Sequence, residues 1–200
     1  MEGFLNPSEV LKQLKLKKEM VAADFGSGAG GWALPLAKIL EEGKVYAIDI
    51  LEEPLSALKA KIKLGKIFNI ELIKSDVNQT SKLTSESCDL VLMTNLLFES
   101  EDKKRVLEEG KRVLKKGAKL LIVDWKLDAP LGPKEGRVSA KEVKALSEEL
   151  DLKVEREFEA GLYHWGLILV KPRSENLTAF GNLPRPLSTS PKPSKLPSLR

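Results

Sequence analysis

A glycine-rich turn between an apolar run and an amphipathic segment constrains this chain more than any other feature. Residues 20–23 form a short apolar run typical of a buried parallel strand, and residues 32–42 place apolar side chains on one helical face. Between them lie four glycines, Gly26, Gly28, Gly30 and Gly31. Glycine allows positive φ and leaves no Cβ in the way of a ligand, and the N–H groups that begin a helix favour an anionic group. The pattern predicts a strand, turn and helix that bind a ligand.

The type of ligand depends on the residue before the turn. Gly26-x-Gly28-x-x-Gly31 also fits the dinucleotide pattern, and that match alone is weak. A dinucleotide would bring its doubly charged pyrophosphate to the turn, where the carboxylate of Asp24 would repel it. A nicotinamide-dinucleotide-dependent oxidoreductase therefore stays an alternative, as does a turn that only packs a helix on a strand.

Asp24-x-Gly26-x-Gly28-x-Gly30 resembles the first motif of class I S-adenosylmethionine-dependent methyltransferases, in particular their small-molecule branch of the ubiquinone and menaquinone biosynthesis type. The resemblance covers about residues 4–172. It implies S-adenosyl-L-methionine as cofactor, and this molecule carries an ammonium, a sulfonium and a carboxylate in place of a pyrophosphate. The resemblance implies that the motif's cofactor-binding residues are Asp24, Gly26, Ser27, Gly28 and Gly30.

A second acid follows the next predicted strand. Residues 44–49 end in Asp49, about 20 residues beyond the glycine turn. In an open parallel sheet the ligand lies across the carboxyl ends of the strands, so Asp49 arrives where a ribose would lie and can accept hydrogen bonds from both hydroxyls. Asp49 is therefore a predicted cofactor-binding residue.

The predicted third strand, 67–73, is followed by Asp76 and Val77. The resemblance implies that Asp76 accepts a hydrogen bond from the exocyclic amine of adenine. It also implies that Val77 and Ile50 flank the adenine ring with apolar surface. Considered without the resemblance, Asp76 is equally suited to capping the turn that follows it.

The predicted fourth strand, 88–93, leads into Asn95, at the edge where the transferred methyl group would lie. Asn95 is a candidate contact for cofactor or acceptor, and it is also an ordinary turn residue. Methyltransferases that act on base amino groups usually carry an Asn/Asp-Pro-Pro-aromatic motif here, and this chain has none. The expected acceptor is a small molecule, and the implied reaction is direct displacement at the sulfonium methyl.

Two further segments are predicted near the acceptor. A fifth strand over 119–124 leads to an irregular stretch, 125–138, that we expect to act as a lid, with Arg137 binding an anionic group of the acceptor. His164 is the only histidine, and its unperturbed pKa near neutrality makes it a candidate catalytic base. The alternative for His164 is a strand-end side chain bonded to backbone.

These elements predict an α/β, Rossmann-like fold with a seven-stranded, mostly parallel sheet, helices on both faces and a C-terminal antiparallel hairpin. The turn over 115–118 precedes the fifth strand, and strands over 152–158 and 162–170 form the hairpin. We expect one domain over 1–173. Residues 174–200 are rich in Pro, Ser and Lys and are predicted to be disordered. A non-catalytic S-adenosylmethionine-binding module is a further alternative.

Composition limits the partners and the compartment. The net charge is +4, but six basic residues and one acidic residue follow Val170, so the preceding body is nearly neutral, which argues against a nucleic acid partner. No apolar run is long enough to cross a membrane, no secretion signal is evident, and a single cysteine, Cys88, excludes an internal disulfide. We expect a cytoplasmic protein without a metal site. The sequence does not indicate an oligomeric state.

Overall fold

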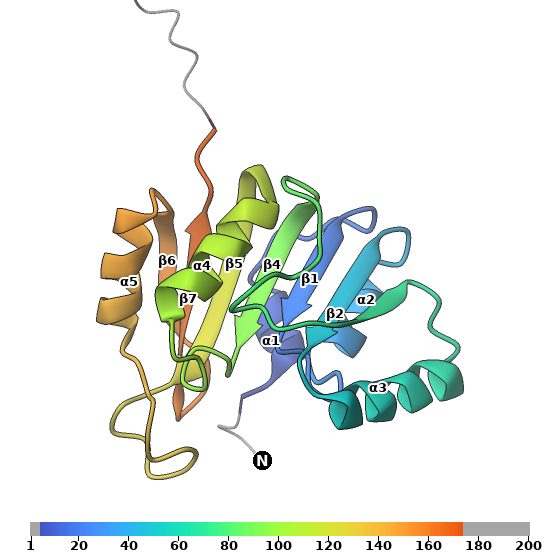
Figure 1. Cartoon of the computed structure of the whole chain (residues 1–200), viewed down its shortest axis with the longest axis horizontal. Helices are drawn as coiled ribbons and strands as arrows, with labels where there is room; N and C mark the ends of the chain where they lie inside the picture. Colours follow the sequence, from blue (N-terminus) through green and yellow to red (C-terminus); the bar gives the residue numbers. More distant parts are fainter. Residues whose placement is uncertain (1–4, 174–200) are drawn as a thin grey trace, which may run out of the picture.

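The computed structural model describes residues 5–173, which form a seven-stranded sheet in the order β3-β2-β1-β4-β5-β7-β6 (Figure 1). The strands are β1 (Val21–Phe25), β2 (Lys44–Asp49), β3 (Ile70–Lys74), β4 (Cys88–Thr94), β5 (Leu114–Trp125), β6 (Lys153–Glu159) and β7 (His164–Val170). The helices are α1 (Pro7–Leu11), α2 (Ala33–Ile39), α3 (Glu52–Gly65), α4 (Lys103–Val113) and α5 (Ala140–Glu149).

The strand pairing confirms the predicted fold. β1 pairs in parallel with β2 and β4, β2 with β3, and β4 with β5, whereas β7 is antiparallel to both β5 and β6. β4 is buried along almost its whole length, as expected for a central parallel strand with both faces covered. The mixed sheet therefore ends in the predicted antiparallel hairpin.

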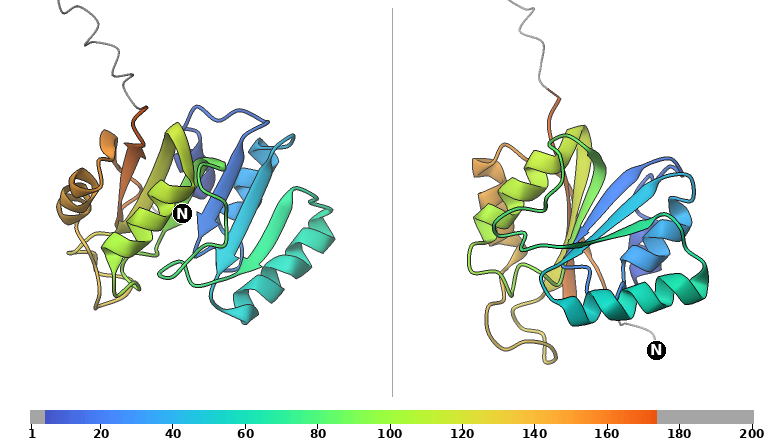
Figure 2. Two further views of the ribbon diagram at one scale, coloured as in Figure 1. Left: turned by 45° about the horizontal axis from the view of Figure 1, so that its top comes forward. Right: turned by 45° about the vertical axis from the view of Figure 1, so that its right-hand side comes forward.

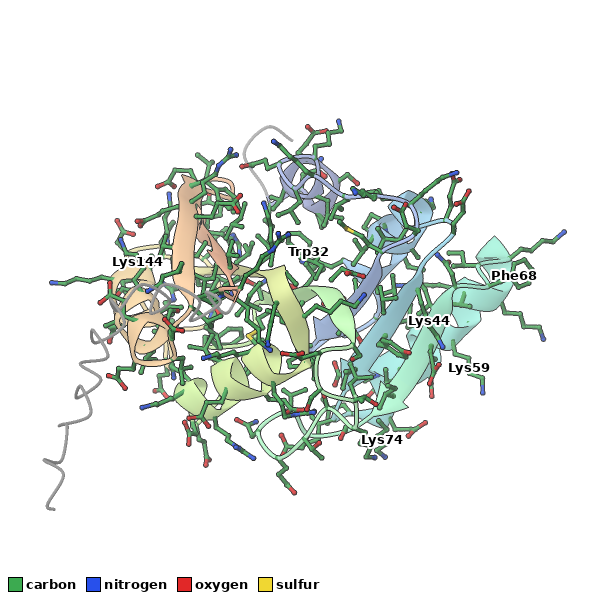
Figure 3. The ribbon with its side chains drawn as sticks, turned by 90° about the horizontal axis from the view of Figure 1, so that it is seen from above. Trp32, Lys44, Lys59, Phe68, Lys74 and Lys144 are labelled. Carbon is green, nitrogen blue, oxygen red and sulfur yellow. The ribbon has the colours of Figure 1, made fainter. Side chains whose placement is uncertain are left out.

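Helices cover both faces of the sheet (Figure 2). Leu11, Leu36 and Leu58 bring α1, α2 and α3 into one apolar cluster, while Val106 and Val143 bring α4 and α5 into the cluster on the other face. Figure 3 shows Phe68 and Lys144 at opposite ends of the molecule, next to the edge strands β3 and β6. Ser139 accepts the N–H of Glu142 and Glu142 bonds back to Ser139, so the predicted cap of α5 is present.

The chain order fixes where a ligand can lie. From β1 the chain moves outward to β2 and β3, and then returns across the sheet to β4 on the other side of β1. The loops that leave β1 and β4 therefore diverge to opposite faces at the carboxyl edge, which opens a crevice at that switch point.

Two predicted boundaries are wrong for identifiable reasons. The fifth strand begins at Leu114 and includes the predicted turn 115–118, because Leu114 pairs with Cys88 and Gly117 (φ +80°) donates its N–H to the Lys171 carbonyl. The third strand begins at Ile70 instead of residue 67, because the Ile67 N–H donates back to the last turn of α3.

The predicted disordered segment 174–200 lies outside the described residues. Between residues 5 and 173, every helix is too short or too polar to cross a bilayer.

The corner between α2 and β2 gives a test of the fold. A Cβ built at Gly43 would lie 1.9 Å from the Met20 carbonyl oxygen, a backbone atom that also accepts the Lys44 N–H. We expect Gly43→Ala to lower the free energy of unfolding by about 3 kcal/mol, because the backbone must move to relieve the clash. Gly31→Ala is the matched control, since a Cβ there meets no atom within 4 Å. Urea denaturation measures both, and a near-neutral Gly43→Ala would contradict this packing.

Candidate functional site

A cavity of about 400 Å³ opens at the carboxyl edge, where the turns after β1, β2, β3 and β4 meet. Seven of the predicted cofactor-binding residues line it: Gly26, Gly28, Asp49, Ile50, Asp76, Val77 and Asn95. Asp24, Ser27 and Gly30 do not line the cavity, although they belong to the adjoining strand end and turn.

Asp24 is fully buried near the end of β1, and neither carboxylate oxygen has a hydrogen-bond partner. Burial raises the pKa of Asp24 to about 8. The nearby Ala33 amide falls short of a hydrogen bond and offsets only part of this increase in pKa, while the charge of Asp49 adds to it. An unpaired buried carboxylate is costly, and a cationic group placed beside it would restore the ionised form.

Asp49 closes the glycine turn onto β2. Its Oδ2 accepts the Gly28 N–H at 2.8 Å, and its Oδ1 accepts the Leu51 N–H at 2.9 Å. The Gly26 and Ser27 N–H groups both donate to the Ile48 carbonyl at 2.9 Å. The turn is therefore held in shape by β2, and each Asp49 oxygen keeps a lone pair for a further donor.

The glycines of the turn serve different steric needs. At Gly28 (φ +52°) a Cβ would meet no atom within 4 Å, so the side facing the cavity is open. At Gly30 (φ +86°) a Cβ would lie 2.3 Å from Leu58 Cδ1, so this glycine lets α3 pack closely. At Gly26 (φ +71°) the nearest atom is Leu96 Cδ1, at 2.9 Å. Gly28 is thus the glycine of these three beside which the structure leaves open space.

The wall after β3 is built by Asp76. Its Oδ1 accepts the backbone and side-chain N–H groups of Asn78, its Oδ2 accepts the Gln79 amide, and these bonds lower its pKa. Asp76 therefore caps its turn, the alternative that the sequence left open, while also lining the cavity. Val77 is buried and Ile50 is 56% exposed, so the cavity has apolar surface beside these acids.

The wall after β4 carries an unusual backbone conformation. Asn95 adopts φ +50°, which a non-glycine residue seldom does, and its N–H donates to the Val123 carbonyl at 2.8 Å. Asn95 Oδ1 and Ser27 Oγ are both buried without a hydrogen-bond partner. Both oxygens are acceptors that remain available to a ligand.

Sequence reasoning missed several cavity residues. Each comes shortly after the end of a strand that contributes to the crevice, a position that would have identified them: Leu51, Pro54, Ser75, Asn78, Leu96, Glu99 and Ser100.

Arg137 and the 126–138 loop differ from the predicted lid. The loop lies beyond the carboxyl end of β5 as expected (Figure 1), but the guanidinium donates to the backbone carbonyls of its own loop. The five acceptors belong to Lys126, Leu127, Ala129, Leu131 and Pro133. Because each of its three nitrogens donates to a carbonyl of the loop itself, Arg137 stabilises the loop, and its binding of an acceptor anion stays a prediction.

His164 begins β7 and does not line the cavity. Its ring lies 4.1 Å from that of Trp125, it is 4% exposed, and both ring nitrogens lack a hydrogen-bond partner, so the alternative of a bond to backbone is not observed. Burial, with a contribution from the charge of Lys126, lowers its pKa to about 4. The pKa of His164 is therefore far below its unperturbed value, because the fold removes the ring from water, and its role as catalytic base stays a prediction.

No group of three or more His, Cys, Asp or Glu side chains within residues 5–173 is arranged to hold a metal ion. The chemistry available at the cavity comes from its acids, amides and backbone N–H groups.

Comparison with known proteins identifies a family over the same region. Residues 23–122 match the family described as a methyltransferase domain. A crystal structure of an S-adenosylmethionine-dependent methyltransferase from Aquifex aeolicus is 35% identical with a TM-score of 0.78, over 84% of this chain and 90% of that chain. A protein described as a type 11 methyltransferase from Sulfolobus solfataricus is 29% identical with a TM-score of 0.68, over 86% and 96% of the two chains.

A curated relative gives a narrower description but a shorter match. The demethylmenaquinone methyltransferase of Geobacillus stearothermophilus is 31% identical over 102 residues. The match covers 50% of this chain and 43% of that protein, so less than half of the relative's length is represented.

The raised pKa of Asp24 predicts how stability depends on pH. The unfolded carboxyl ionises near its ordinary pKa of 3.8, whereas the folded carboxyl holds its proton up to about pH 8, so stability falls as the pH rises between these values. Asp24→Asn stays neutral. We expect it to exceed the parent in free energy of unfolding, by a difference that grows by at most about 1.4 kcal/mol per pH unit over that range.

Urea denaturation of the ligand-free protein at pH 5, 6.5 and 8 measures this difference. Asp128→Asn is the matched control, because Asp128 is an exposed aspartate in the 126–138 loop. A difference for Asp24→Asn that stays constant with pH would contradict the raised pKa.

Proposed function

The chain belongs to the class I S-adenosylmethionine-dependent methyltransferases, and on this basis we propose that it transfers the methyl group of S-adenosyl-L-methionine to a small-molecule acceptor. The observation that carries the proposal is the buried, unpaired carboxylate of Asp24 beside the glycine turn. The cofactor's ammonium would satisfy this acid, and its methyl group is activated by the positive sulfonium. A pyrophosphate would instead meet the charge of Asp49 and could not stabilise an ionised Asp24, which disfavours the dinucleotide alternative.

Each side of the cavity suits a different part of the cofactor. We assign Asp24 to the ammonium group, Asp49 to the ribose hydroxyls, and Asp76 with Val77 and Ile50 to the adenine. Gly28 leaves the turn open, and the unpaired oxygens of Asn95, which lines the cavity, and of Ser27, in the adjoining turn, are assigned to the remaining polar groups of the cofactor. Gly26 and Gly30 permit the backbone conformation that the turn requires.

The protein's contribution to catalysis is binding, orientation and exclusion of water. Direct displacement needs an acceptor atom in line with the transferred methyl group, so the chief role of the walls is to hold the two reactants in register. Asn95 directly follows β4 and lines the cavity. It is therefore the predicted cofactor-binding residue at the strand end where we expect the acceptor to bind.

We assign the acceptor only to a chemical class, that of small organic molecules. The family and the curated relative named for demethylmenaquinone support a small organic acceptor, and the nearly neutral body of the chain argues against nucleic acid. A cytoplasmic location and an independent folding domain over 1–173 are part of the same proposal.

Asp49 provides the test of cofactor binding. We expect a hundredfold excess of S-adenosylhomocysteine over its Kd to raise the free energy of unfolding of the parent by about 2.7 kcal/mol. Asp49→Ala should lose most of this gain. It should also lose about 1 kcal/mol without ligand, because the Gly28 and Leu51 amides lose their acceptor. Asp128→Ala is the control, and equal stabilisation of Asp49→Ala and the parent would remove Asp49 from the site.

Methyl transfer is tested with labelled S-adenosylmethionine and a panel of small molecules that includes demethylated quinols. Labelled product that depends on Asp49 supports the enzyme. Binding of S-adenosylhomocysteine without turnover on any acceptor would favour the non-catalytic module, and binding of NADH in its place would favour the oxidoreductase.

His164 stays a proposed catalytic base, in the neutral form that its environment imposes. We expect His164→Gln to reduce methyl transfer by roughly 10²-fold while leaving the Kd for S-adenosylhomocysteine unchanged. Because the pKa of His164 is about 4, turnover should not show a histidine step between pH 6 and 9. Unchanged turnover in His164→Gln would leave catalysis to orientation alone.

A further inference from the structure

Asp124 is a buried acid at the end of β5 that the proposed catalytic site does not use. Its side chain is fully buried, and no cation within residues 5–173 lies within ion-pairing distance of it. Its Oδ2 accepts the N–H groups of Leu97 at 3.0 Å and Phe98 at 3.3 Å, while its Oδ1 accepts the N–H of Trp125 at 2.7 Å. The carboxylate therefore ties the turn after β4 to the end of β5.

This turn forms a wall of the cofactor cavity. Asn95 and Leu96 both line the cavity, and Asn95 is anchored to β5 through the Val123 carbonyl. Leu96 Cδ1 occupies the space that a Cβ at Gly26 would need, so the turn packs directly on the glycine loop. Any movement of the turn would change the shape of the cavity at the point where β1 and β4 diverge.

The same turn also contacts the 126–138 loop. A Cβ at Gly136 would lie 2.1 Å from the Phe98 carbonyl oxygen, so the two backbones are in close contact. Trp165 Nε1 donates to the carbonyls of Trp125 and Val138, which closes both ends of that loop. The turn held by Asp124 thus lies between the cofactor cavity and the acceptor side.

Only an ionised carboxylate satisfies this arrangement completely. Three backbone N–H donors converge on its two oxygens. An amide replaces one of these oxygens with an N–H donor, and the hydroxyl oxygen of a protonated acid accepts a hydrogen bond more weakly than a carboxylate oxygen does. We propose that Asp124 is a positioning residue for cofactor binding, which holds the turn over Asn95–Phe98 so that Leu96 and Asn95 close the cavity around the cofactor. The inference rests on the proposed function.

The charged and titratable groups around Asp124 allow a readout by pH. Burial raises the pKa of Asp124 to about 6, against the opposing effects of its three amide donors and of Lys103 on α4. His164 on β7, whose ring lies 4.1 Å from that of Trp125 at an angle of 41°, is neutral above about pH 4, and Glu99 directly follows the turn. Asp24 is present in both the parent and a variant at Asp124, so a ratio of two Kd values removes its contribution.

The test compares Asp124→Asn with the parent by calorimetric titration of S-adenosylhomocysteine. We expect the variant to bind roughly tenfold more weakly at pH 7.5, where the parent carboxylate is ionised. The ratio should fall toward one at pH 5, where the parent acid is protonated and resembles the amide. A ratio that is constant with pH, or equal to one at pH 7.5, would overturn the proposal.

Asp89→Asn is the matched control. Asp89 also accepts a backbone N–H, that of Val21 at 3.0 Å, and it pairs with Lys115. It lies near the amino end of β4, away from the carboxyl ends of the strands where the cavity opens. Its Kd ratio should stay near one at both pH values. A parent protein that binds no S-adenosylhomocysteine would contradict the proposed function itself, whereas a parent that binds with an indifferent Asp124→Asn contradicts only this inference.

If Asp124→Asn does not fold, amide hydrogen exchange of the parent protein tests the proposed role of Asp124 instead. In the parent with bound S-adenosylhomocysteine, the Leu97 and Phe98 amides should be protected at pH 7.5 and should lose protection at pH 5, after correction for the intrinsic exchange rate. The Leu92 amide in β4 serves as the internal control. Equal protection of Leu97 and Phe98 at both pH values would overturn the proposal.

Discussion

The buried carboxylate of Asp24 at the end of the central strand is the constraint on which the rest of the site depends. β1 lies in the middle of the sheet with neighbours on both sides, so Asp24 cannot reach water, and no donor completes its hydrogen bonding. Without a ligand this arrangement costs stability whenever the acid is ionised. A cationic group beside the carboxylate would offset that cost, so under the proposed function cofactor binding would stabilise the fold.

Around this acid, the turns of the carboxyl edge are each held by a carboxylate that accepts backbone N–H groups. Asp49 holds the glycine turn, Asp76 holds the turn after β3, and Asp124 holds the turn after β4. A carboxylate has enough lone pairs to bond a turn and still offer an acceptor to a ligand. The walls of the cavity are therefore formed before a ligand arrives, which reduces the ordering that binding requires.

Arg137 holds the 126–138 loop together. Arg137 satisfies five carbonyl oxygens of the 126–138 loop, which has no regular secondary structure to pair them. An irregular segment at the surface keeps a defined shape when its polar groups are bonded internally. The loop consequently keeps a defined shape beyond the carboxyl end of β5.

The sequence by itself determined the fold class, the glycine turn and the acids at the strand ends. Apolar runs, turn glycines and caps such as Ser139 with Glu142 act over a few residues, so their consequences can be read locally. The spacing of Asp24, Asp49 and Asp76 places them at one edge, because parallel strands share a direction.

Only the tertiary structure decided the surroundings of His164, Arg137 and Asp124. The pKa of His164 depends on the burial that Trp125 and the neighbouring strands impose, and the donors of Arg137 are taken up by carbonyls whose positions no local pattern specifies. Asp124 meets amides 26 and 27 residues away. Burial and long-range hydrogen bonds arise only after the elements pack, and for that reason the sequence drew attention to His164 and Arg137 without revealing their contacts, and it did not single out Asp124.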